Sequence, residues 1–328
     1  MTEAQSTDDP KANDPLADEA ILRRAHQQWK LIVQAESELR ARMLADYKFI
    51  DEDGAQWDTQ ARADRQADGR PCLSIDRTSG PIRQTLNQIR QARPAVHVHP
   101  VDNGADPAKA EVRQGVIRRI ETDSMADVAY LTAAEHQLKM GRGYWRLLTE
   151  WDETQPYQHI RIAPIDNPSN VYYDPRCRKP DYSAGRCAFL PEDLDPEDYT
   201  ERFGAEPPAS LDQFRASGDA APDWFPRGKV RIAEYFHVTV TAQPTPRPDG
   251  SVSRGERRKV MWYLITASEI LDRREIPGPY IPVVPVIGER TNIDGVIDLK
   301  GIVRRAKGPQ VMINVHRSSE VELMSLAT

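Results

Sequence analysis

The chain has 328 residues and a formal net charge of −6 at pH 7, and 29% of its residues are charged. This length predicts two or three domains with a substantial buried core. The mean hydropathy is −0.64, and no run approaches the roughly 18 to 20 apolar residues that a membrane helix needs. We therefore expect no membrane partner. The acidic balance also argues against tight binding of nucleic acid, because proteins that hold DNA neutralise its phosphates with a basic surface.

The cysteines and the N-terminal residues indicate a cytosolic setting. Cys72, Cys177 and Cys187 make an odd count without CxxC spacing, which favours reduced thiols over a disulfide framework or a zinc site. The first residues are acidic and small where a signal peptide would be basic and then apolar, so no export is expected.

The first 70 residues divide into two segments. Residues 1–16 are polar and contain Pro and Asp, which predicts a disordered tail. Residues 17–70 form a helical segment that begins with a long amphipathic helix from Ala17 to about Tyr47. Such a helix suits packing across another domain or subunit. A boundary is expected near residue 70, where Gly, Arg and Pro follow one another.

Residues 71–290 are predicted to form an α+β domain, because helical and strand patterns alternate unevenly rather than as repeated βαβ units. Its helices are expected near residues 80–93, in two segments within 105–140, and at 196–204, with Val112 and Val116 facing inward. Its strands are expected at 95–99, 144–151, 159–165, 186–190, 229–242 and 259–266. Residues 243–258 are predicted to be a mobile hairpin tip. The proline-rich residues 277–286 are expected to run across the surface rather than to form a central strand.

A basic stretch lies near the start of this domain. No acidic residue occurs between Arg77 and Val101, whereas four arginines do: Arg77, Arg83, Arg90 and Arg93. Two interpretations stay open, a solvated helix face and a surface that meets an acidic partner or a neighbouring subunit. His97 and His99 share a face of the predicted strand, but no third ligand is near, so a metal site is not expected.

Residues 291–328 carry the most informative pattern. Apolar residues after Gly295 recur with a helical period, at Leu299, Ile302, Val303 and Ala306. Three basic residues, Lys300, Arg304 and Lys307, lie on the opposite face of that predicted helix. Gly308 and Pro309 predict a helix stop and a new start.

The second predicted helix runs from Pro309 toward Leu326 and ends while still apolar, so the chain is expected to stop inside an element. Its apolar surface should be covered by more of the same polypeptide or by neighbouring copies.

Motifs of catalysis are absent from the sequence. It has no phosphate-binding GxxxxGK[ST], no HExxH, no GxSxG and no complete GxGxxG. Gly141 and Gly143 stand between a helix and a strand, the reverse of the dinucleotide-binding order, and predict a tight turn. We expect no enzymatic activity, no cofactor and no metal.

Six stretches, in the same order along the chain, resemble the portal proteins of short-tailed double-stranded DNA phages. They are RPCLSIDR (70–77), RQTLNQIRQARPAVHVHPVD (83–102), AEHQLKMGRGYWRLLTEW (134–151), IDNPSNVYYDP (165–175), PGPYIPVVPVIGE (277–289) and GIVRRAKGPQVMINVHRSS (301–319). The resemblance covers residues from about 20 to 328. Family members continue well beyond this length, so the resemblance implies that the clip that contacts the motor and tail, the returning stem helix and any C-terminal crown or barrel are missing here.

The resemblance implies a dodecameric homo-oligomeric ring at one vertex of the capsid, assembled in the host cytoplasm and carried in the virion. Its partners would be the terminase motor, capsid and scaffold proteins, and tail adaptors. The α+β body would be the wing, and the helices after Gly295 would begin the stem around the channel.

Double-stranded DNA would pass through that channel with weak, non-specific contacts. Lys300, Arg304 and Lys307 are candidates for those contacts, and the alternative is that they are solvated or pair with acids of the adjacent subunit. The competing functions are another head-tail structural adaptor and a nucleic-acid-processing enzyme with an unrecognised site.

Overall fold

The computed structural model describes residues 15–92, 96–101, 106–151, 157–206, 228–246 and 252–327. The chain splits into two compact units, each built from two stretches. Unit 1 comprises Met1–Ser37 and Ser169–Ile281, and unit 2 comprises Glu38–Pro168 and Pro282–Thr328. The helix predicted from residue 17 is confirmed as α1 (Pro15–Asp51) and contributes to both units. Residues 71–290, expected to form one domain, are shared between the units. Most of the predicted tail, residues 1–16, lies outside the described residues.

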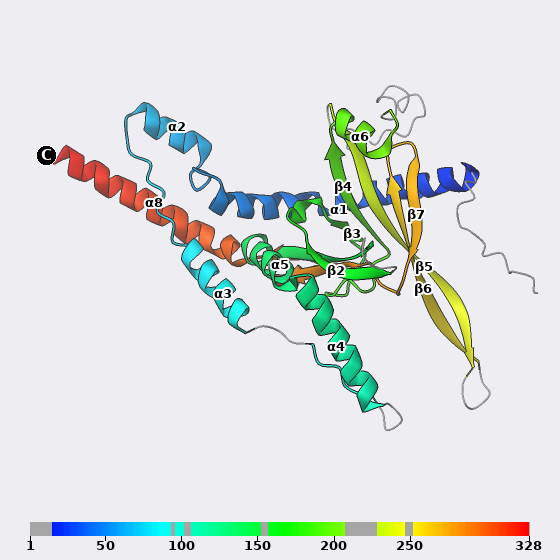
Figure 1. Cartoon of the computed structure of the whole chain (residues 1–328). Coiled ribbons are helices and arrows are strands. Elements are labelled where there is room, and N and C mark those ends of the chain that lie inside the picture. The colour runs from blue at the N-terminus through cyan, green and yellow to red at the C-terminus, as the bar shows by residue number, and fades with distance from the viewer. Residues whose placement is uncertain are drawn as a thin grey trace, which may run out of the picture. The chain divides into compact units, whose positions relative to one another are not determined.

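Unit 1 is built on a five-stranded antiparallel sheet in the order β3-β4-β5-β6-β7. The strands are β3 (Tyr172–Tyr173), β4 (Cys187–Leu194), β5 (Val230–Pro246), β6 (Val252–Ile265) and β7 (Ile270–Ile276), with helix α6 (Pro196–Phe203) after β4. β5 and β6 pair as far as Pro246 and Val252, and so extend past their neighbours as a two-stranded ribbon (Figure 1). Most of the segment predicted as a mobile tip is therefore strand, and residues 247–251 lie outside the described residues.

The core of unit 1 forms where the first half of α1 covers this sheet. Ala25, Trp29 and Ile32 recur at helical spacing and are almost completely buried. They pack on strand side chains that include Phe189 and Tyr235, whose rings stack with centroids 4.6 Å apart. This is apolar helix-on-sheet packing, in which both partners present residues of the expected period.

Unit 2 combines a three-stranded sheet, a hairpin and most of the helices. The antiparallel sheet has the order β2-β1-β8, with β1 (Arg142–Trp151), β2 (Gln158–Pro164) and β8 (Val283–Ile287). The helices are α2 (Thr59–Ala67), α3 (Ser79–Gln91), α4 (Pro107–Asp123), α5 (Ala126–Met140) and α8 (Ile302–Leu326), and η1 (Pro168–Asn170) is a short 3-10 turn where the chain leaves the unit. β8 lies at the edge of its sheet, where its proline is tolerated.

Glycines allow a close crossing of backbones in unit 2. Gly141 ends α5 in the left-handed conformation, with φ of 93°, and a Cβ there would lie within 2.7 Å of the backbone of Lys300. At Gly301 a Cβ would lie 2.2 Å from the carbonyl oxygen of Leu138. Only glycine fits such spacing, and the tight turn predicted between helix and strand at Gly141 is confirmed.

Two expectations for the end of the chain are wrong. Residues after Gly295 do not begin a helix, because β9 (Glu289–Ile293) and β10 (Val296–Lys300) form an antiparallel hairpin. Asp294 and Gly295, with φ of 51° and 80°, make the two-residue turn that favours such a hairpin. The chain then enters α8, which continues through Gly308 and Pro309 without a break.

A proline inside a helix costs about 3 kcal/mol, and contacts on both sides of Pro309 offset that cost. Val303 is buried in an apolar cluster before it, and Gln310 is buried after it. Tertiary packing therefore overrides the local stop signal.

Two smaller expectations are also wrong. Residues 96–99 are not in a strand, and residue 95 lies outside the described residues. Val112 and Val116 of α4 are exposed rather than inward. The predicted mixture of helices and strands is confirmed, and none of the described helices is long and apolar enough to cross a membrane.

Candidate functional site

The terminal helix α8 buries mostly polar residues, whereas a packed helix usually buries apolar ones. Of its four buried residues, one is apolar, Val303, and three are polar: Gln310, Asn314 and Ser318. The polar three are spaced by four residues, so they lie along one face of the helix. We call them the polar ladder. A helix that packs on its own chain normally buries apolar residues, so this face needs hydrogen-bond partners.

The partners are backbone amides of an irregular segment, residues 70–77, which we call the strap. Ser318 Oγ accepts from the N–H of Leu73 at 2.9 Å, and Asn314 Oδ1 accepts from the N–H of Ile75 at 2.9 Å. Gln310 Oε1 accepts from the N–H of Arg77 at 3.1 Å. Alternate amides of the strap are thus bound by successive turns of α8.

Side chains also bind the carbonyl groups of the strap. Arg65 donates to the carbonyl of Pro71 from Nε and Nη2, and Trp57 Nε1 donates to the carbonyl of Leu73 at 3.1 Å. Gln310 Nε2 donates to the carbonyl of Ile75. The strap is therefore held along one edge as a strand would be in a sheet, but by side chains instead of a second strand.

The ladder face ends at Glu322, four residues after Ser318. Its carboxylate lies 2.8 Å from Arg70 Nε and 3.2 Å from Arg65 Nη2. The hydrogen bond from Arg70 is the main cause that lowers the pKa of Glu322, and it outweighs the opposing effect of burial. Polar contacts therefore occupy four successive turns of α8.

The outward face of the same helix is apolar. Met312 is 69% exposed, Leu323 67% and Leu326 78%. Val311 and Val315 are also exposed. We call these five residues the outer face. Their spacings of three, four, eight and eleven residues place them on one broad stripe. An apolar stripe of this length on a helix marks an interaction surface.

The three basic residues predicted to share a helix face are divided between two elements. Lys300 ends β10, and its Nζ lies 3.8 Å from Glu289 on the paired strand β9. Arg304 and Lys307 lie in the first turns of α8, and both form ion pairs with Asp46 of α1. The structure therefore brings Arg304 and Lys307 together and leaves Lys300 out.

Asp46 is the centre of this basic cluster. Its side chain is 0% exposed, and Lys307 Nζ lies 2.7 Å from one of its oxygens. A second carboxylate, Asp298, lies 3.7 Å from Arg304 and 3.5 Å from Arg42. Buried carboxylates require paired cations, so Arg304 and Lys307 fix the start of α8 to α1 within unit 2.

The arginines of the acid-free stretch are placed differently. Arg83 and Arg90 lie on α3, Arg77 ends the strap, and all three are exposed. Arg93 lies outside the described residues. Only the backbone of Arg77 joins the ladder, and within the described ranges no ion pair involves the side chains of the other two or of Arg77. They offer an uncompensated positive surface.

Other charged groups of unit 2 serve the fold. Lys139 is bound by Asp51 at 2.9 Å and by Glu135 at 2.8 Å. Burial alone would lower the pKa of Lys139, but the hydrogen bonds to Glu135 and Asp51 raise it. Burial lowers the pKa of the neighbouring His136. The charged lysine and neutral histidine join α5 to the second half of α1.

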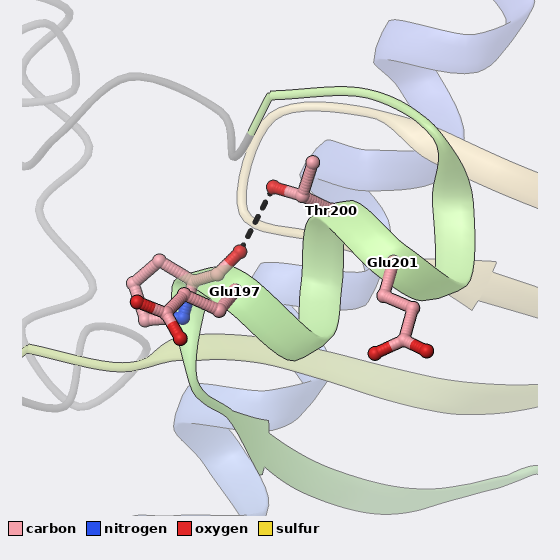
Figure 2. A pocket seen from close by; sticks show the side chains of 4 residues that line it. Glu197, Thr200 and Glu201 are labelled. Atoms are coloured by element: carbon pink, nitrogen blue, oxygen red, sulfur yellow. Dashed lines mark hydrogen bonds between the residues drawn. The ribbon is translucent and has the colours of Figure 1, made fainter.

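A hollow beside α6 in unit 1 has no arrangement suited to catalysis. Pro196, Glu197, Thr200 and Glu201 line it (Figure 2). The hydroxyl of Thr200 donates to the carbonyl of Pro196 at 2.9 Å and is thus used by the helix itself. Across the part of the chain that the structure describes, no group of three or more His, Cys, Asp or Glu side chains is placed to hold a metal ion.

Two of these features left signals that the sequence interpretation missed. Gln310, Asn314, Ser318 and Glu322 recur every four residues, and a search for apolar periodicity passes over them. Asp46 lies three residues after Met43 and seven after Leu39, at a position where the buried stripe of α1 should be apolar. A charged residue on such a stripe predicts a buried ion pair.

Comparison with known proteins supports one family. The family described as Phage P22-like portal protein matches residues 26–328. The portal protein of Acyrthosiphon pisum secondary endosymbiont phage 1 is 24% identical over 319 residues, covering 85% of this chain and 44% of that protein. The chain thus spans somewhat less than half the length of this relative. Because the family match extends over almost the whole described chain, the chain belongs to the phage P22-like portal protein family.

Proposed function

We propose that the chain is a subunit of the portal ring at one vertex of a phage capsid, through which double-stranded DNA is packaged and ejected and to which the tail attaches. Membership of the portal family supports this proposal. In it, the chain supplies the wing and the start of the stem, and terminase, scaffold and tail adaptor proteins are partners of the assembled ring. The role is structural.

The outer face of α8 is the observation that carries the proposal. An isolated subunit would expose Met312, Leu323 and Leu326 to water, although burial of apolar surface stabilises by about 25 cal/mol per Å². The inner face of α8 is already occupied by the strap. Neighbouring copies that pack on the outer face in a head-to-tail manner would cover it and close a ring.

The DNA contacts proposed for Lys300, Arg304 and Lys307 remain a prediction. Arg304 and Lys307 already have a carboxylate partner in Asp46. Any contact with phosphate would therefore use the positive charge of this cluster that its carboxylates do not neutralise. Three cations, Arg42, Arg304 and Lys307, surround two carboxylates in this cluster. A modest positive excess is suited to weak, salt-screened contacts with passing DNA.

Substitution on the outer face tests the proposed assembly. Val315→Glu places a charge on the apolar stripe, and we expect loss of rings in mass photometry and negative-stain microscopy with an unchanged circular dichroism spectrum. Arg317→Glu is the matched control, because it adds the same group at an exposed polar position that lies three or four residues from no member of the outer face. Rings that survive Val315→Glu would show that the outer face does not join subunits.

A further inference from the structure

The polar ladder is unusual because it buries polar side chains where apolar ones would pack. Gln310 is 1% exposed, and Asn314 and Ser318 are 0% exposed. Burying polar groups is costly unless every group is paired. The strap supplies those pairs through three alternate amides. Apolar packing is non-directional, whereas these hydrogen bonds fix which side of the helix faces inward.

The spacing of the two segments explains why the ladder has three rungs. Two residues of extended chain advance by about 6.6 to 6.8 Å, and four residues of helix advance by about 6.0 Å. The two repeats therefore stay in step over a few turns. The next rung would join residue 71 to Glu322, but Pro71 has no N–H. Arg65 and Arg70 bind Glu322 in its place.

A second contact fixes the orientation of the ladder amides. Gln56 Oε1 accepts from Asn314 Nδ2 at 2.8 Å and from Gln310 Nε2 at 3.2 Å. With their nitrogens engaged by Gln56, both amides direct their oxygens at the strap. The rungs at Gln310 and Asn314 are thereby specified by more than one bond each, and such connected hydrogen bonds reinforce one another.

We infer that the polar ladder sets the rotation of α8 about its own axis and so selects the face that meets a neighbouring copy. This inference rests on the proposed ring. A rotation by one residue, about 100°, would break every rung and leave buried amides without acceptors. A slip by one rung is opposed by Pro71 at one end and by the pairing of Arg304 and Lys307 with Asp46 at the other. Polar groups inside a helix interface are known to set register in this way.

Residue-level hydrogen exchange of the full chain tests the ladder directly. We expect the amides of Leu73 and Ile75 to exchange at least tenfold more slowly than those of Cys72 and Ser74. Ser318→Ala should remove the protection of Leu73, and Ser318→Thr, which keeps the hydroxyl, should restore it. The matched control Ser319→Ala should change nothing. Equal exchange along the strap would overturn the ladder, whether or not rings form.

The effect on rotation needs a separate measurement. In the double variant Gln310→Leu and Asn314→Leu, hydroxyl-radical footprinting should show at least a twofold fall in the reactivity of Met312. Native mass spectrometry should show a mixture of subunit numbers where the unaltered chain gives one. If the strap amides lose protection while Met312 reactivity and subunit number are unchanged, the ladder only stabilises the fold and the inference fails.

If the double variant does not fold, the reactivity of Met312 and the subunit number are measured on Ser318→Ala instead. A wild-type chain that forms no rings would instead contradict the proposed function, and the reactivity of Met312 would still decide whether the ladder sets the rotation of the helix.

Discussion

Two helices of this chain solve the same packing problem in opposite ways. In unit 1, the first half of α1 buries Trp29 and Ile32 against a sheet. In unit 2, α8 turns Gln310 and Asn314 inward and leaves Met312 outside. The first arrangement completes a core within one chain, because apolar surface meets apolar surface. The second leaves an apolar surface that more of the polypeptide or a neighbouring copy could cover.

The difference separates what stabilises the subunit from what the subunit offers to its partners. Apolar burial in unit 1 is strong but tolerant of small shifts. The polar contacts of α8 contribute less per group, about 1 kcal/mol for each hydrogen bond, but they specify direction. We therefore expect substitutions in unit 1 to change stability most, and substitutions on α8 to change the geometry of assembly.

The largest effect is expected from Trp29→Ala. Trp29 is 2% exposed and contacts the rings of Phe189 and Tyr172. Removal of such a ring costs about 3–5 kcal/mol, measured as the free energy of unfolding of the full chain in urea. Leu31→Ala, two residues along on the exposed side of α1, should cost less than about 0.5 kcal/mol. A loss below about 1 kcal/mol at Trp29 would mean that the sheet does not depend on α1.

The next effect concerns the buried carboxylate of unit 2. The double substitution of Arg304→Gln and Lys307→Gln leaves Asp46 buried without a cation, which should cost about 3 kcal/mol in urea denaturation. Adding Asp46→Asn should recover much of that loss, because the uncompensated charge is then gone.

Lys300→Gln is the control for the substitutions around Asp46, since the partner of Lys300, Glu289, is half exposed and 3.8 Å away. We expect a change below about 1 kcal/mol for this surface pair. If the double variant is as stable as the unaltered chain, Arg304 and Lys307 are free to serve DNA alone.

Much of the fold could be predicted from the sequence where local pattern and tertiary packing agree. The long helix α1, the helix to strand turn at Gly141 and the hairpin strands β5 and β6 are confirmed. Each has a clear period or a residue with special backbone freedom. The strand order of the sheets was not predicted, because pairing depends on contacts distant in sequence.

The errors arise where a local signal competes with another. Residues 296–306 carry apolar residues at spacing that fits a helix, but Asp294 and Gly295 form a turn that selects a hairpin. Gly308 and Pro309 read as a stop, but contacts of Val303 and Gln310 keep α8 continuous. The ladder was missed because its repeat is polar rather than apolar, and because its donors are backbone amides of a distant segment, whose position the sequence does not display.

A smaller effect is expected at a partly buried histidine of unit 1. Tyr235 Oη donates to Gln28 at 2.7 Å and accepts from His237 Nδ1, while Arg24 donates to His237 Nε2 at 3.3 Å. Burial, with the charges of Arg24 and Arg186, lowers the pKa of His237 to about 4. The folded state therefore prefers neutral histidine, and this contribution to stability is present above about pH 6.5, the ordinary value, and is lost as the pH falls toward 4.

The expected loss is about 2 kcal/mol between pH 7 and pH 4, after allowance for partial exposure. His237→Gln cannot take up the proton, so its free energy of unfolding in urea should fall less over the same range. Parallel pH profiles for the two proteins would show that His237 does not limit stability in acid.

The smallest effect on stability is expected at the arginines of α3. Substitution there distinguishes most clearly between a role in the fold and a role in partner binding. Arg83 and Arg90 are exposed and lie seven residues apart on one side of the helix. Their replacement by Glu should change the free energy of unfolding by less than about 0.5 kcal/mol, as for surface positions generally. A loss above about 1 kcal/mol would place them in the fold of unit 2.

Assembly of the same variant then decides between the two interpretations of the acid-free stretch. If these arginines meet acids of a neighbouring subunit or another partner, the charge reversal should weaken assembly at low salt, and added salt should reduce the difference by screening. The Gln versions are the control, because they remove charge without repulsion. Rings that form equally well with Glu, Gln and Arg at both positions would show that α3 presents a solvated face, and that the subunit contacts lie on α8.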